Sequence, residues 1–165
     1  MASGAAIGGF LWAATRLVDL VGPAETSLTF DAELLNRRFS WPGTFDPAAR
    51  LCLPEALSTW SGWAEAGELE RCEKLADTAD DVLTSVGAIA TAGPPFRPPR
   101  LRTFILPGVA LPVLQEQLSD KNIRAWTGSR GTDSSLVRIA THVYNDPTDL
   151  DALADAVSTS FSMIR

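Results

Sequence analysis

The chain has 165 residues, of which 45% are hydrophobic and 21% are charged, a composition typical of a globular domain that can bury a core. Its 20 acidic and 14 basic residues give a net charge of −6, so it lacks the basic surface that nucleic-acid binding requires. One histidine and two cysteines cannot supply a four-ligand zinc site, so we expect no metal.

The first 14 residues are apolar and rich in glycine and alanine, but they lack the basic segment that opens a secretion signal. The apolar run is also too short to span a bilayer, so we expect a soluble, cytoplasmic protein. Residues 7–13 predict a short buried strand behind two glycines. Residues 16–21 predict a brief helix or strand, and residues 24–40 are polar and irregular.

Two helices are expected next. Apolar residues recur at steps of three and four over residues 48–64, and Pro54 should bend or split that helix. Asp46 is the expected N-cap, with Pro47 at the first helical position. Residues 68–86 form the second helix, and we expect Cys52 and Cys72 to be small buried hydrophobic residues.

After a proline-rich hinge, the pattern changes to alternating strands and helices, which predicts a small α/β sandwich. The final helix should begin at Pro147, with Asp146 as its N-cap and Asp149 near the positive end of its dipole. The other expected elements are strands over residues 102–106, 123–126 and 135–140, a helix over residues 111–118, and the hinge itself at residues 93–99.

The first 86 residues do not close easily into a fold of their own. A lone buried-type strand followed by two long helices leaves apolar surface that must pack against something else. This arrangement favours an obligate partner.

Three segments occur in an order that indicates a family: residues 8–12 (GGFLW), residues 39–57 (FSWPGTFDP…LCLPEAL) and residues 137–146 (VRIATHVYND). Together they resemble the C-terminal part of class V aminotransferase-like enzymes, fold-type I proteins that use pyridoxal 5′-phosphate (PLP), and in particular the isopenicillin N epimerase-like members. The resemblance implies an α/β fold made of the last strand of the large domain, two helices and a small α/β domain.

In that family, the lysine that binds PLP lies just upstream of the first segment, which here begins a few residues after Met1. Lys74 and Lys121 do not resemble it. The resemblance therefore implies a split enzyme, in which a large partner subunit carries the lysine, with a heterotetramer of two heterodimers as the expected assembly. The corresponding division is residues 1–46, which complete the partner's large domain and PLP site, a helical connector over residues 47–92, and the small domain over residues 93–165.

Two groups of site residues follow from the resemblance. Gly43 and Thr44 correspond to a pair that contacts the PLP phosphate of a neighbouring protomer; a helix start favours anions, although a plain turn would explain the same residues. Arg138 corresponds to the arginine that binds the substrate α-carboxylate. It lies in an apolar strand, where an unpaired charge is costly to bury, but a structural salt bridge is the alternative.

Further candidates are His142, Trp41 and Arg124. Strand alternation places His142 on the same face as Arg138, where it could line a substrate pocket, although a structural histidine is the better interpretation. Trp41, together with Phe39, could form a wall of the site, or belong to a core. Arg124 is a possible second anion contact.

Related desulfurases use a cysteine on a loop before the carboxylate-binding arginine, and residues 127–135 contain none. The resemblance thus leaves epimerisation, elimination, side-chain lyase chemistry and transamination open. The leading hypothesis is the small subunit of a PLP enzyme acting on an amino acid, not active alone. The alternatives are a non-catalytic binding or regulatory module for a full-length relative and an independently folded pseudo-enzyme.

Overall fold

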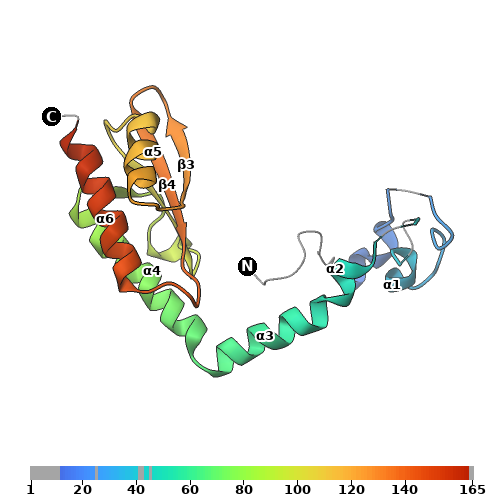
Figure 1. The fold of residues 1–165 in the computed structure, drawn as a ribbon. Coiled ribbons are helices and arrows are strands. Elements are labelled where there is room, and N and C mark those ends of the chain that lie inside the picture. The colour runs from blue at the N-terminus through green and yellow to red at the C-terminus, as the bar shows by residue number, and fades with distance from the viewer. Residues whose placement is uncertain (1–11, 25, 41–42, 45, 164–165) are drawn as a thin grey trace. The chain divides into compact units, whose positions relative to one another are not determined.

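The computed structural model describes residues 12–24, 26–40, 43–44 and 46–163 (Figure 1). The strand expected over residues 7–13 lies outside these residues, except for Trp12 and Ala13, which have irregular backbone. The chain divides into two compact units, Met1–Gly62 and Trp63–Arg165, and each is described by itself. The finer division at residues 46 and 92 stays a prediction.

The first unit contains short helices. They are a 3-10 helix at Thr15–Leu20 and the α-helices α1 (Leu35–Arg38), α2 (Ala48–Leu51) and most of α3 (Leu53–Glu65). The expected helix over residues 48–64 is split between α2 and α3, as Pro54 predicted, because proline has no N–H to donate to the preceding turn. The N-cap of α2 is Pro47 rather than Asp46, whose carboxylate instead accepts a bond of 2.9 Å from the amide of Ala48.

None of the described residues of the first unit is buried, so these residues form no hydrophobic core among themselves. A single guanidinium holds its irregular part together. Arg38 donates to the carbonyl oxygens of Val18, Val21, Ala32 and Glu33 at 2.8–3.1 Å. Such polar contacts order the backbone without burying apolar surface, so this unit has little hydrophobic stabilisation of its own.

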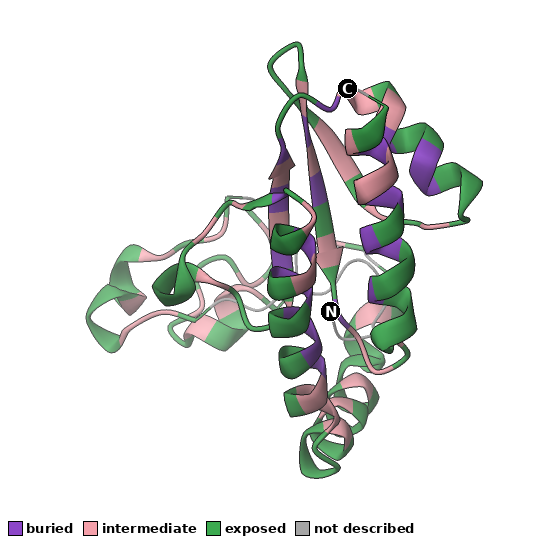
Figure 2. Ribbon diagram, turned by 90° about the vertical axis from the view of Figure 1, so that its left-hand side faces the viewer, coloured by how far each residue is buried: buried purple, intermediate pink, exposed green. Residues whose placement is uncertain are grey.

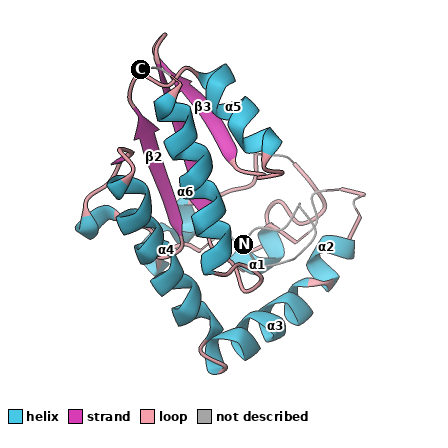
Figure 3. Ribbon diagram, turned by 60° about the vertical axis from the view of Figure 1, so that its left-hand side comes forward, coloured by secondary structure: helices cyan, strands magenta, loops and turns pink. Residues whose placement is uncertain are grey.

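The second unit is an antiparallel sheet with helices on one face (Figure 3). The strand order is β1-β2-β4-β3, and every neighbouring pair is antiparallel. Its elements are α4 (Glu68–Ser85), β1 (Ile89–Ala90), a 3-10 helix (Pro94–Phe96), β2 (Leu101–Leu106), α5 (Leu111–Asp120), β3 (Trp126–Arg130), β4 (Ser134–Ala140) and α6 (Pro147–Ser162).

Most expected elements of this unit are confirmed, but the strand over residues 123–126 is wrong. Helix α5 ends at Asp120, and Asn122 takes a positive φ of 54°. The amide of Ile123 then bonds back to the carbonyl of Leu118 at 2.8 Å, so it joins the helix end instead of a strand ladder. Ladder pairing begins only at Trp126. Strand β1 has two residues, too few for a period to be visible in the sequence.

The core lies between the sheet and the helices α4, α5 and α6 (Figure 2). Alternation along β2 directs Phe104 and Leu106 into this core. Asp146 is the N-cap of α6 as expected, and together with Asp149 it forms a capping box, since each of the two carboxylates accepts a backbone amide. The sequence pattern predicts that Val157, Phe161 and Ile164 of this helix face the sheet. Val157 is buried and Phe161 packs on the core, while Ile164 lies outside the described residues.

Candidate functional site

The face of the sheet opposite the helices, the outer face, exposes a mainly apolar set of side chains. Strand alternation and register place on it Ile89, Leu101, Thr103, Ile105, Trp126, Gly128, Arg130, Ser134, Leu136, Arg138 and Ala140, none of which is buried. Antiparallel sheets with one covered and one open face are common, but the open face is then usually polar. An apolar open face is therefore a candidate binding surface.

Arg138 lies in the middle of this face. Its register partners are Thr103 on β2 and Trp126 on β3, and its guanidinium carbon lies 4.5 Å from the centre of the indole ring. No carboxylate among the described residues forms an ion pair with it. Arg138 is exposed, so its charge is not buried as the apolar strand had suggested, and no burial cost arises. The exposed guanidinium has donors available for an anion.

His142 does not continue the strand, and its expected place beside Arg138 on the sheet face is wrong. Strand β4 ends at Ala140, and His142 lies in the turn before α6. Its ring stacks on Tyr144 at 4.6 Å and meets the edge of Trp63 at 5.1 Å, both measured between ring centres. The half-buried histidine thus belongs to an aromatic cluster.

The turn that carries His142 is held by α4. Arg71 donates to the carbonyl oxygens of Val143 and Asn145 at 2.7 and 2.9 Å, and Glu68 binds the same guanidinium at 2.8 Å. The bond to Glu68 raises the pKa of Arg71. This anchoring role of Arg71 could not be predicted from the sequence, because a basic residue in an amphipathic helix carries no signal of a contact more than 70 positions away.

Gly43 and Thr44 belong to the first unit. Gly43 has a φ of 116°, and no atom lies within 4 Å of the position where a side chain would begin. Thr44 is exposed, so the amides and the hydroxyl here are open to a ligand oxygen. The expected help from a helix dipole is wrong, since α2 has only four residues. Trp41 lies outside the described residues, and Phe39 is half-buried after α1.

Both lysines of the chain, Lys74 and Lys121, form ion pairs with acidic residues. Lys74 pairs with Glu70 at 2.7 Å on the exposed side of α4, which raises the pKa of Lys74 and lowers that of Glu70. Lys121 pairs with Asp155. Neither lies in a strand of the outer face. The residues that the structure describes thus fit a contact to a phosphate at Gly43 and Thr44, but not the covalent attachment of PLP.

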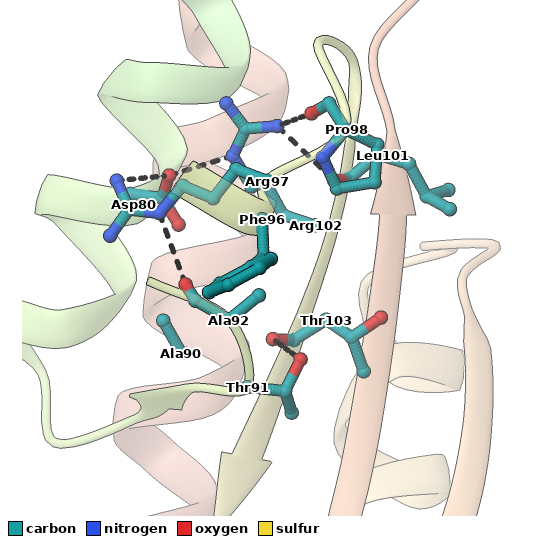
Figure 4. A pocket seen from close by; sticks show the side chains of 10 residues that line it. All are labelled: Asp80, Ala90, Thr91, Ala92, Phe96, Arg97, Pro98, Leu101, Arg102 and Thr103. Carbon is teal, nitrogen blue, oxygen red and sulfur yellow. Dashed lines mark hydrogen bonds and ion pairs between the residues drawn. The ribbon is translucent and has the colours of Figure 1, made fainter. Parts of the chain in front are cut away.

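A cavity of about 240 Å³ lies beside the start of β2 (Figure 4). At its wall, Asp80 of α4 accepts bonds from Arg102 at 2.7 Å and Arg97 at 3.2 Å. Arg102 also donates to the carbonyl oxygens of Pro98 and Leu101. This buried ion pair joins α4, the proline-rich segment and β2, and four of the five N–H donors of Arg102 are taken by bonds within the chain.

The remaining candidate residues, Arg124 and the two cysteines, are not part of the outer face. Arg124 is exposed in the loop before β3, beside a shallow hollow next to α5. Cys72 is buried in α4 as expected, but Cys52 is exposed, which corrects its expected burial. In the described part of the chain, no three His, Cys, Asp or Glu residues gather where they could hold a metal ion. No helix there is both long and apolar enough to cross a membrane.

Neither a family model nor a curated protein matches the chain. Solved structures do: a NifS-like protein (19% identity, TM-score 0.61), the cysteine desulfurase CsdA from Escherichia coli (21%, 0.61) and a NifS-like protein from Rickettsia africae (16%, 0.62). The matches cover 73–76% of this chain but only 33–36% of those chains. Identities this low establish the fold alone, which is that of the C-terminal third of fold-type I PLP enzymes.

Proposed function

We propose that this chain is the small subunit of a split PLP-dependent enzyme that acts on an amino acid. Arg138 binds the substrate carboxylate, Gly43 and Thr44 contact the phosphate of PLP, and a partner polypeptide supplies the lysine. The observation that carries the proposal is the exposed guanidinium of Arg138 at the centre of an apolar sheet face. This face belongs to a fold shared with the C-terminal third of PLP enzymes.

The first unit supports the need for a partner. Large apolar side chains are exposed in it, including Trp12, Leu20, Leu28, Leu34 and Leu51. Scattered apolar residues are normal on protein surfaces, but here they accompany a segment with no buried residue among those described. Association with a large subunit would bury these side chains and give the described part of the segment a hydrophobic core. We expect an interface above about 2,000 Å², as in obligate complexes.

Each residue has a defined task in this proposal. The planar guanidinium of Arg138 can bind a carboxylate through two parallel hydrogen bonds, which fixes the orientation of the amino acid. Thr44 donates its hydroxyl to the phosphate, and the open backbone at Gly43 lets that phosphate approach closely. PLP, when bound to the partner's lysine, supplies the electron sink that weakens bonds at the α-carbon.

The hairpin between β3 and β4 narrows the types of reaction that are compatible with this chain. The hairpin between β3 and β4 lies within residues 127–135, which contain no cysteine. A persulfide route that needs a nucleophilic cysteine on this loop is therefore disfavoured, although one structural neighbour is a cysteine desulfurase. Epimerisation, elimination, side-chain lyase chemistry and transamination remain compatible with Arg138 and Thr44, and we favour the epimerase-like branch on the sequence resemblance.

The test is co-expression with candidate lysine-bearing partners, with an affinity tag on this chain only. Co-purification of a partner with the yellow absorbance of lysine-bound PLP supports the proposal. A colourless chain that purifies alone as a sharply melting monomer contradicts it. Co-purification with a complete, lysine-bearing enzyme whose activity is unchanged by Arg138→Ala favours the non-catalytic binding module instead.

In the active complex, Arg138→Ala should raise KM for the amino acid while PLP stays bound, and Thr44→Ala should weaken PLP retention. Arg130→Ala is the matched control for Arg138, because Arg130 is also exposed and lies at the far end of β3. Unchanged substrate affinity in Arg138→Ala would remove the carboxylate assignment. Unchanged PLP retention in Thr44→Ala would make Thr44 a turn residue only.

A further inference from the structure

We infer that Trp126 is a positioning and specificity-determining residue for the Arg138 site, and that the carboxylate ligand carries an apolar or aromatic group lying against the indole. This inference rests on the proposed role of Arg138 in binding a carboxylate. It goes further by naming the chemistry of the rest of the ligand and a second residue that recognises it.

The first observation is the contact between the two side chains. Trp126 and Arg138 are direct register partners on β3 and β4, and the guanidinium carbon lies 4.5 Å from the centre of the indole ring. A guanidinium that lies over an aromatic ring is held by cation–π attraction. Its N–H groups point outward in the plane of the group and stay free for a carboxylate. Trp126 thus restricts a long, flexible side chain to one orientation.

The second observation explains how the ring takes this position. Its outer edge lies over Gly128, the next residue on the same face of β3. A Cβ at Gly128 would come within 2.8 Å of the Cη2 atom of Trp126 and within 3.4 Å of two other ring atoms. Any side chain at Gly128 would therefore displace the indole. The sequence Trp-Thr-Gly builds a flat aromatic surface that glycine alone permits.

The third observation concerns the surroundings of this pair. Leu136 and Ala140 flank Arg138 along β4, and Ile105 lies opposite Leu136 on β2. Among the described strand residues of the outer face there is no acidic side chain. Trp126 keeps 48% of its surface exposed, so the ring still offers contact area. Arg130 shares this face but lies at the far end of β3, so Arg138 is the cation within its apolar part. An apolar surface around one central cation matches a carboxylate that carries an apolar group rather than a second charge.

The test compares two simple carboxylates, acetate and phenylacetate, on the full chain, in its complex where a partner co-purifies. Binding is followed through the Arg138 Nε–Hε NMR signal, which the nearby indole also shifts. Phenylacetate should bind about threefold to tenfold more tightly than acetate, as expected for one aromatic contact. Trp126→Leu should remove this preference, and Trp126→Phe should keep part of it. Gly128→Ala should reduce the preference by displacing the ring.

The outcomes separate this inference from the proposed function. If Arg138→Ala abolishes binding of both probes while Trp126→Leu and Gly128→Ala keep the phenylacetate preference, the carboxylate site stands and the role of Trp126 is overturned. If Arg138→Ala changes neither affinity, the carboxylate assignment fails and this inference fails with it. The ratio of the two affinities is the decisive readout, because a general loss of structure would lower both affinities together. Arg130→Ala should leave the ratio unchanged.

Discussion

The buried ion pair between Asp80 and Arg102 gives a quantitative test of what joins α4 to the sheet. Both side chains are only 6% exposed, and the Nε of Arg102 lies 2.7 Å from Oδ2 of Asp80. Removing one partner of a buried pair costs about 3–5 kcal/mol, since an uncompensated charge stays in a poorly solvated place. Asp77, whose side chain is 69% exposed, binds the same guanidinium at 2.7 Å.

Asp80→Ala should therefore destabilise the second unit by about 3 kcal/mol, the lower end of that range. The loss is limited because Arg102 keeps Asp77 and two carbonyl oxygens as partners. In a domain of about 100 residues, this corresponds to a fall in Tm of about 12–24 °C. Asp77→Ala is the matched control, and as an exposed ion pair it should cost less than about 1 kcal/mol.

The assay is hydrogen exchange of the amides of β2 and β4, because it reports on the second unit alone. A paired replacement, Asp80→Leu with Arg102→Met, removes both charges and should recover most of the lost stability. Two results would refute the reasoning. One is a cost for Asp80→Ala no larger than that for Asp77→Ala. The other is a paired variant as unstable as Asp80→Ala, which would mean that shape rather than charge matters at this position.

The remaining predictions concern the two ends of the described chain. The amides of residues 12–62 should exchange rapidly in the isolated chain and become protected in the complex, since none of the described residues in this range is buried. Equal protection in the isolated chain and in the complex would contradict the proposed interface. Hydrogen bonds from Thr148 lower the pKa of Asp146 at the start of α6. A depressed pKa stabilises the fold above the unfolded value of about 4, and this contribution is lost as pH falls through the folded value. Asp146→Asn keeps a capping side chain that does not titrate. The unfolding free energy of this variant should therefore fall less steeply below pH 4 than that of the unmodified protein. If the two free energies fall in parallel with pH, titration of Asp146 does not contribute to the acid sensitivity of the fold.

The candidate site shows where sequence reasoning succeeded and where it failed. Arg138 was proposed from the family resemblance and from the unusual place of a charge in an apolar strand, but its exposure was not foreseen, since apolar residues lie on both sides of β4. His142 was misplaced because nothing in the sequence marks the end of β4 at Ala140. Trp126 was assigned to the end of a strand over residues 123–126, whereas β3 begins there. The polar residues that follow it show no apolar alternation from which the strand could be predicted.

Local chemistry in the sequence determined the elements with strong periodicity or caps, including α4, β2 and β4, the split between α2 and α3 at Pro54, and the capping box of α6. These features depend on contacts within a few residues, so they are visible in the chain alone. Only the tertiary structure decided which face of the sheet the helices cover, and therefore that Arg138 and Trp126 share an open surface. Alternation shows which residues share a face, but packing between distant elements decides which face is buried.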